Sequence, residues 1–161
     1  MTPKFFFVIV GLMLFGCNSN TSIKTETTKF SSNMTFDELF DNWISGIIKT
    51  ESPGKRIIAY KFGIFETTDI PSGYYLYLVG SKEYDEDDDD WAAGFGDYQP
   101  KNTYLGLPEN EFKNVEWEKV EEMIIKKVKA FIKTDDYKSS FFNNAKAIAV
   151  GFDEGDLVRV R

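Results

Sequence analysis

Two stretches of the chain repeat apolar residues every three or four positions, the spacing of an amphipathic helix. The first begins after Thr35, which forms a capping-box pattern with Glu38. It predicts a helix over about residues 35–49, and the turn residues at 52–54 follow it. The second stretch predicts another helix over about residues 115–133.

The apolar residues of the second helix form a broad stripe, so we expect this helix to be well buried. Asn114 immediately precedes the helix and is its expected N-cap. Acidic residues lie near the start of the helix and lysines near its end, an arrangement that complements the helix dipole. Both helices therefore have an apolar face that can pack against other elements.

Four shorter stretches have the β-branched and aromatic residues, or the alternation, that are typical of strands. They cover about residues 56–66, 74–80, 145–152 and 157–160. Turn residues at 69–73 and 153–156 join these stretches in pairs, which predicts two antiparallel hairpins. The second stretch is apolar on both faces, so we expect it inside the sheet. The element order predicts an α+β domain, with an antiparallel sheet built from two hairpins and two main helices packed on it.

The segment at residues 81–107, between the first hairpin and the second helix, has no regular pattern. A loop of this length in a compact domain is usually functional or contains an unrecognised element. One candidate for such an element is a short strand near residues 102–105. The most unusual part of the segment is the acidic run Asp85-Glu86-Asp87-Asp88-Asp89-Asp90-Trp91.

The start of the chain has a different character. A basic residue, Lys4, precedes an apolar stretch that ends at Leu14-Phe15-Gly16-Cys17. This arrangement resembles the lipobox of bacterial lipoprotein signals, which implies cleavage before Cys17 and a lipid on its thiol. The alternatives are an ordinary secretory signal with an incidental cysteine, or a membrane anchor, but a span needs about 20 apolar residues and this stretch is shorter.

The lipobox interpretation divides the chain into three segments. They are a signal peptide at 1–16, a lipidated tether at 17–33 and a single α+β domain at 34–161. We expect the protein in the bacterial cell envelope, attached to the membrane by the lipid on Cys17. Asn18 follows the cysteine instead of the Asp that marks retention in the inner membrane of some bacteria, which favours the periplasmic face of the outer membrane.

Composition excludes several classes of chemistry. The chain has no histidine and one cysteine, which excludes Ser-His-Asp and Cys-His catalysis, histidine-ligated zinc and internal disulfides. The remaining polar residues show no spacing that places a catalytic pair, so we expect no enzyme activity, no catalytic residue and no cofactor. The net charge of −7 arises mainly from seven acidic residues between positions 83 and 90, so the chain lacks the basic patch that binds nucleic acid.

Three interpretations of the acidic run are open. The first is a solvated loop without a specific role. The second is a calcium site, because Asp85, Asp87 and Asp89 alternate as in an EF-hand loop. Asp90 and Gly96 stand where that loop needs Gly and Glu, so we assign no metal ligand.

The third interpretation is a recognition loop for a protein partner. Acidic charge steers a basic partner toward the loop, and an aromatic side chain supplies affinity, unless Trp91 packs on the domain beneath. The predicted partner-binding residues are Asp85, Glu86, Asp87, Asp88, Asp89, Asp90 and Trp91.

Residues 74–84, the acidic run into Trp91, and residues 147–156 together resemble small bacterial immunity proteins of polymorphic toxin systems. Such proteins are compact α+β domains that bind and neutralise a cognate toxin. The resemblance implies a lipid-anchored, non-enzymatic protein whose acidic loop binds a basic toxin within the envelope. The alternatives are a structural or assembly lipoprotein of the envelope, or a calcium-binding lipoprotein.

Overall fold

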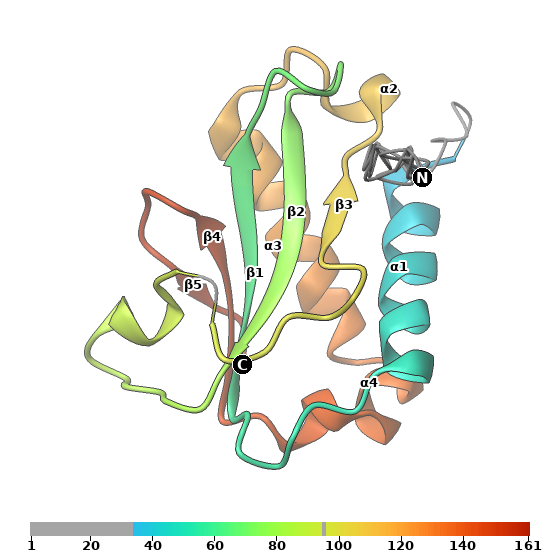
Figure 1. Cartoon of the computed structure of the whole chain (residues 1–161). Coiled ribbons are helices and arrows are strands. Elements are labelled where there is room, and N and C mark those ends of the chain that lie inside the picture. The colour runs from blue at the N-terminus through green and yellow to red at the C-terminus, as the bar shows by residue number, and fades with distance from the viewer. Residues whose placement is uncertain (1–33, 95) are drawn as a thin grey trace, which may run out of the picture.

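A five-stranded mixed sheet, in the order β3-β2-β1-β4-β5, forms the centre of the molecule (Figure 1). The computed structural model describes residues 34–94 and 96–161. The elements are α1 (Phe36–Thr50), β1 (Ala59–Glu66), β2 (Tyr74–Ser81), the 3-10 helix η1 (Asp89–Ala92), β3 (Tyr104–Gly106), α2 (Glu109–Phe112), α3 (Trp117–Phe131), α4 (Asp135–Ser139), the 3-10 helix η2 (Phe141–Asn144), β4 (Ala147–Phe152) and β5 (Val158–Arg159).

The strand pairing confirms the predicted α+β class and both hairpins. β1 pairs with β2 and β4 pairs with β5, each antiparallel. The two hairpins are joined by a parallel pairing of β1 with β4, in which Tyr60 lies beside Ile148. β3 extends the sheet beyond β2, so the short strand expected near residues 102–105 exists and β2 lies inside the sheet as predicted. The sheet is therefore mixed, although most of its pairings are antiparallel.

The predicted capping box begins α1. The Thr35 hydroxyl accepts a hydrogen bond from the Glu38 N–H, and the Thr35 N–H donates to Glu38 Oε2 at 2.9 Å. This backbone hydrogen bond, together with one from the Thr35 hydroxyl, lowers the pKa of Glu38. Farther along α1, Asp37 and Asp41 each lie 2.9 Å from Lys127 Nζ of α3, so ion pairs join the two helices.

The expected N-cap of the second helix is wrong. α3 begins at Trp117, and its N-cap position is Glu116, which makes no side-chain capping hydrogen bond. Asn114 instead has a φ of 59°, in the left-handed region that asparagine tolerates better than most residues. Asn114 therefore lies in the turn between α2 and α3 and does not cap α3.

Helices α1 and α3 pack on the same face of the sheet, and the apolar core lies between them and the strands (Figure 1). Phe142 of η2 lies at the centre of this core. Its ring contacts those of Tyr60, Phe62 and Phe131, with centroids 4.8, 6.3 and 5.6 Å away. Burial of each large apolar side chain contributes about 1.5–3 kcal/mol, so this face of the sheet supplies most of the stability.

The predicted signal peptide, the tether and Cys17 lie at residues 1–33, outside the residues that the structure describes. Over residues 34–94 and 96–161, no helix has both the length and the apolar character needed to cross a membrane. The lipid anchor at Cys17 therefore stays a prediction.

Candidate functional site

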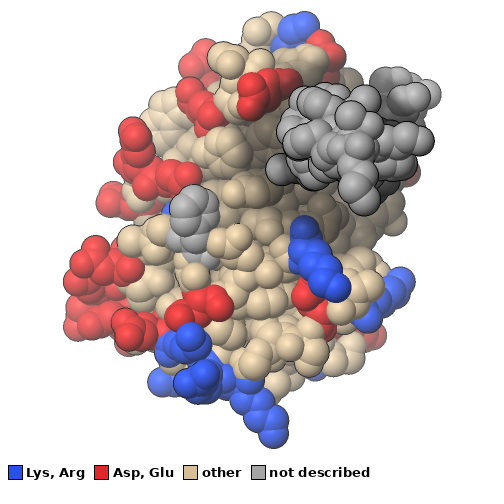
Figure 2. Space-filling model, in the orientation of Figure 1, with Lys and Arg blue, Asp and Glu red and all other residues tan. Residues whose placement is uncertain are grey.

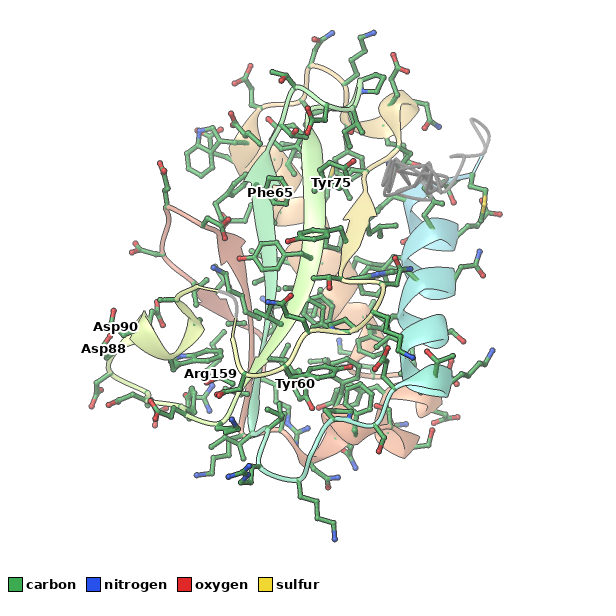
Figure 3. All side chains as sticks on the ribbon, viewed as in Figure 1. Tyr60, Phe65, Tyr75, Asp88, Asp90 and Arg159 are labelled. Atoms are coloured by element: carbon green, nitrogen blue, oxygen red, sulfur yellow. The ribbon has the colours of Figure 1, made fainter. Side chains whose placement is uncertain are left out.

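Four aromatic rings lie together on the face of the sheet that α1 and α3 do not cover. We call them the aromatic face: Phe65 of β1, Tyr75 and Tyr77 of β2, and Tyr104 of β3. The rings of Phe65 and Tyr75 stack with centroids 5.4 Å apart, and Figure 3 shows them on neighbouring strands. Tyr104 meets Phe65 edge to face at 6.0 Å and is 47% exposed. Partly exposed aromatic rings supply much of the affinity at protein interfaces.

The position of Tyr77 depends on a glycine in the neighbouring strand. Gly63 of β1 lies directly opposite Tyr77 in the antiparallel register. A Cβ atom at Gly63 would stand 2.0 Å from Cζ of Tyr77, so the tyrosine ring lies across the glycine. Any larger residue at this position would push the ring away from the sheet.

A charged pair with one buried member, Lys61, lies beside the aromatic face. The side chain of Lys61 is 6% exposed, and its Nζ lies 3.3 Å from Oδ1 of Asp153, in the turn after β4. The Tyr77 hydroxyl donates a hydrogen bond to the same oxygen, and Lys61 Nζ lies 5.7 Å from the centroid of the Tyr77 ring. Burial, and then the hydrogen bond and charge of Asp153, raise the pKa of Tyr77 well above its usual value. Tyr77 therefore stays protonated and acts as a donor near neutral pH.

The charged pair and the aromatic rings line one cavity of about 390 Å³. Phe65, Tyr77 and Tyr104 form its aromatic walls, and Lys61 and Asp153 provide its charged groups. Residues 93–94, immediately after η1, close another side of the cavity. The volume lies within the range of about 300–1,000 Å³ that is usual for small-ligand sites.

The predicted acidic run lies in a loop that we call the acidic loop, residues 83–91. Its backbone is folded back by its own side chains: Asp85 accepts from the N–H of Asp87 at 3.0 Å, and Asp88 accepts from the N–H of Asp90 at 2.8 Å and caps η1. Asp89 also accepts from the Leu157 N–H at 3.3 Å, which connects the loop to the second hairpin. These contacts give the loop a defined shape.

Contacts of the Tyr84 ring anchor the acidic loop to β5. The Arg159 guanidinium lies 5.2 Å from the centroid of the Tyr84 ring, and Trp91 meets the same ring edge to face at 5.5 Å. Arg159 Nη1 also lies 2.7 Å from Glu86 Oε1. Trp91 is thus half-buried against Tyr84, and only part of its surface is available to a partner.

An ion pair joins the residues on either side of the acidic loop. Lys82 Nζ lies 2.7 Å from Asp97 Oδ1, and the Lys82 N–H donates to the other carboxylate oxygen at 2.9 Å. These two hydrogen bonds lower the pKa of Asp97. Residues 82 and 97, on either side of the acidic loop, are therefore held together.

The acidic loop displays its charge to solvent. All seven of its acidic residues are exposed. Figure 2 shows acidic side chains gathered along one edge of this side of the molecule, with a broad uncharged area beside them. Within the described part of the chain, no group of three or more acidic or cysteine side chains is arranged to hold a metal ion. The alternating aspartates Asp85, Asp87 and Asp89 therefore gain no support as a calcium site.

The sequence reasoning found the acidic loop but missed the aromatic face and the charged pair. The alternation of Tyr75 and Tyr77 signalled that both side chains point to one face, but not that the helices leave this face uncovered. Lys61 was not singled out, and its only signal is that it is a lysine within an apolar strand. Its partner Asp153 is far away in the sequence, and only the parallel pairing of β1 with β4 brings them together.

Comparisons with protein-family models, with curated proteins and with solved structures give no match to this chain. No family is therefore assigned, and the resemblance to immunity proteins stays a prediction. The function has to be inferred from the geometry of the uncovered face and of the acidic loop beside it.

Proposed function

We propose that this chain is a lipid-anchored, non-enzymatic protein of the bacterial envelope that binds a basic protein partner. The partner would contact the acidic loop and the aromatic face together. One observation carries the proposal: residues 93–94, which follow η1 at the end of the acidic loop, line the same cavity as Phe65, Tyr77 and Tyr104. The chain that leaves the acidic loop therefore borders the aromatic face.

This combination suits protein recognition for a physical reason. Exposed acidic charge speeds the encounter with a basic surface and selects against acidic ones. Aromatic rings then supply contact area at a small entropic cost, and they are enriched where binding free energy is concentrated. The acidic loop provides the first property and the aromatic face provides the second.

A binding role fits the cavity better than a catalytic one. Its polar groups Lys61, Tyr77 and Asp153 already pair with one another. The raised pKa of Tyr77 prevents this phenol from acting as a base near neutral pH. We therefore propose that these groups shape the surface and do not carry out a reaction.

We further propose that the partner is a toxin that the protein neutralises, as the resemblance to immunity proteins implies. The lipid on Cys17 would hold the domain at the periplasmic face of the outer membrane, where an incoming toxin is met. The alternative of a structural or assembly lipoprotein would not require a single stoichiometric partner.

A capture experiment tests the binding role. The tagged full chain would be purified from its native host beside a variant in which residues 87–90 are changed from Asp to Asn. A matched control carries the same number of charge-neutralising changes on the helical side, at Glu118, Glu122, Asp135 and Asp136, all of which are exposed. We expect one stoichiometric partner with the wild type and the control, and weaker binding with a flatter salt dependence in the Asn variant. Equal affinity in the Asn variant, or no stoichiometric partner at all, contradicts the proposal.

Lipid attachment has its own test. Cells that express the full chain would be grown with a labelled fatty acid, beside cells that express the Cys17→Ser variant. We expect the label in the wild type alone, and release of the variant from the membrane fraction. Absence of label from the wild type, or equal labelling of both proteins, contradicts the proposed anchor.

A further inference from the structure

The cavity on the uncovered face has a feature that a protein interface does not require. Lys61 is nearly enclosed, with 6% of its side chain exposed. Its ammonium group has three N–H donors, and Asp153 Oδ1 accepts one of them at 3.3 Å, longer than the 2.7–2.9 Å of a strong charge-assisted bond. Among the described residues, no other acceptor forms a hydrogen bond with this nitrogen. Burial of an ammonium group with donors left over costs free energy, which an acceptor on a ligand would recover.

Asp153 supplies the complementary group. Its Oδ1 accepts from both Lys61 and Tyr77, whereas the described residues provide no donor for its Oδ2. The side chain is 48% exposed, so this second oxygen can be reached from the cavity. The wall of the cavity therefore presents a donor next to an acceptor.

The other walls suit a flat ligand. The rings of Phe65, Tyr77 and Tyr104 line the cavity, and Tyr104 is 47% exposed and can stack on a planar group. Gly94 lies at the margin of the cavity, on the side where residues 93–94 line it.

The charges around the cavity favour a neutral ligand. Lys61 and Asp153 balance each other, so neither sign of charge gains from the pair as a whole. The exposed acidic loop beside the cavity disfavours an anion, and the ammonium of Lys61 disfavours a buried cation. An uncharged ligand avoids both penalties.

We propose that this cavity binds a neutral planar ring in which a carbonyl acceptor lies beside an N–H donor, the chemistry of a cyclic amide. The carbonyl oxygen accepts from Lys61, the N–H donates to Asp153, and the ring stacks on Tyr104. The site uses groups on β1, on β3 and in the turn after β4. It does not depend on the protein partner proposed above.

Uracil is a suitable probe, because it is neutral at pH 7 and carries this pattern of groups. The full chain would be titrated with uracil while backbone amide resonances are followed by NMR. We expect saturable shifts near residues 61, 104 and 153. We expect 1,3-dimethyluracil, which has the carbonyl groups but no N–H donor, to bind at least about tenfold more weakly. No shift at millimolar uracil, or equal affinity for the two probes, overturns the proposal.

Two substitutions locate the binding within the cavity. Lys61→Met keeps the apolar stem and removes the donor, and we expect it to abolish uracil binding. Tyr104→Leu removes the stacking surface at a half-exposed position and should weaken binding about fivefold or more, even if the lysine variant folds poorly. Trp117→Leu is the matched control, because Trp117 is 48% exposed and lies outside this cavity. Retention of full affinity by Tyr104→Leu, or an equal loss in the control, overturns the assignment.

The acidic-loop variant separates the two proposals. Changing residues 87–90 from Asp to Asn should leave uracil affinity within about twofold, since the ligand is neutral, while partner binding falls. Loss of both in this variant would show that the cavity and the loop act as one protein-binding site, which overturns the ligand proposal. Absence of a partner with uracil binding intact would instead contradict the proposed function alone.

Discussion

The two faces of the sheet are built from the same strands by the same alternation of side chains, yet they differ in what lies against them. On the covered face, rings such as Phe62 and Phe142 are fully enclosed by α1, α3 and η2. On the other face, Phe65, Tyr75 and Tyr104 touch one another and remain partly exposed. Aromatic residues therefore have two roles in this molecule, and the packed elements opposite them decide which role each ring has.

The largest difference between the faces should appear in stability. We expect Phe142→Ala to lower the free energy of unfolding by about 3–5 kcal/mol, because the lost ring leaves a cavity at the centre of the core. Tyr104→Ala should cost about 1 kcal/mol or less, because that side chain is already half-exposed. Urea unfolding measures both values, and similar losses in the two variants would contradict the assigned roles.

Gly63 tests the close packing of the Tyr77 ring on the uncovered face. We expect Gly63→Ala to lower the free energy of unfolding by about 1–3 kcal/mol, because its methyl group would overlap the Tyr77 ring. In a Tyr77→Leu background the same change should cost much less, so the two substitutions should be strongly coupled. Additive effects in a double-mutant cycle would show that the ring does not lie across the glycine.

Alkaline pH tests the protonation of the buried phenols. Burial raises the pKa of Tyr60, Tyr77 and Tyr98 above the unfolded value, with further increases from neighbouring groups. The unfolded chain therefore releases these protons first, and the stability they contribute is fully present below about pH 10 and is lost as the pH rises further. Tyr77→Phe should flatten this decline by up to about 1.4 kcal/mol per pH unit. Urea unfolding between pH 9 and 11 measures the slope, and an unchanged slope in the variant contradicts the raised pKa.

The smallest stability effect is expected in the acidic loop. Changing residues 87–90 from Asp to Asn should alter the free energy of unfolding by no more than about 0.5 kcal/mol, because these side chains are exposed. Asn also keeps the oxygen atoms that accept from Asp90 and Leu157. Thermal unfolding measures the change, and a loss of several kcal/mol would mean that the loop's charges maintain the fold.

The sequence predicted the parts of this fold that local rules determine. Apolar spacing located α1 and α3, a capping box marked the start of α1, and turn residues identified both hairpins. It did not predict the parallel pairing of β1 with β4, because that contact joins segments far apart in the chain and leaves no local signal. Asn114 was misassigned because the residues that favour N-caps also tolerate the left-handed backbone of a turn.

The candidate site also has one part that could be predicted from the sequence and one part that could not. The acidic loop could be recognised because its charge is concentrated in one run, from Asp85 to Asp90. The pairing of Lys61 with Asp153 could not be recognised from the sequence, because it depends on the order of the strands in the sheet. The exposure of the aromatic face could not be predicted either. The alternation of side chains along a strand places residues on a face of the sheet but does not show what covers that face.

Hydrogen exchange on the captured complex tests the central claim most directly, which is that the acidic loop and the aromatic face form one binding surface. Backbone amides of the full chain would be compared with and without the bound partner. We predict slower exchange both in the acidic loop, residues 83–91, and around Tyr104 of β3, with α1 and α3 unchanged. Protection confined to α1 and α3, with the uncovered face unaffected, would contradict the account.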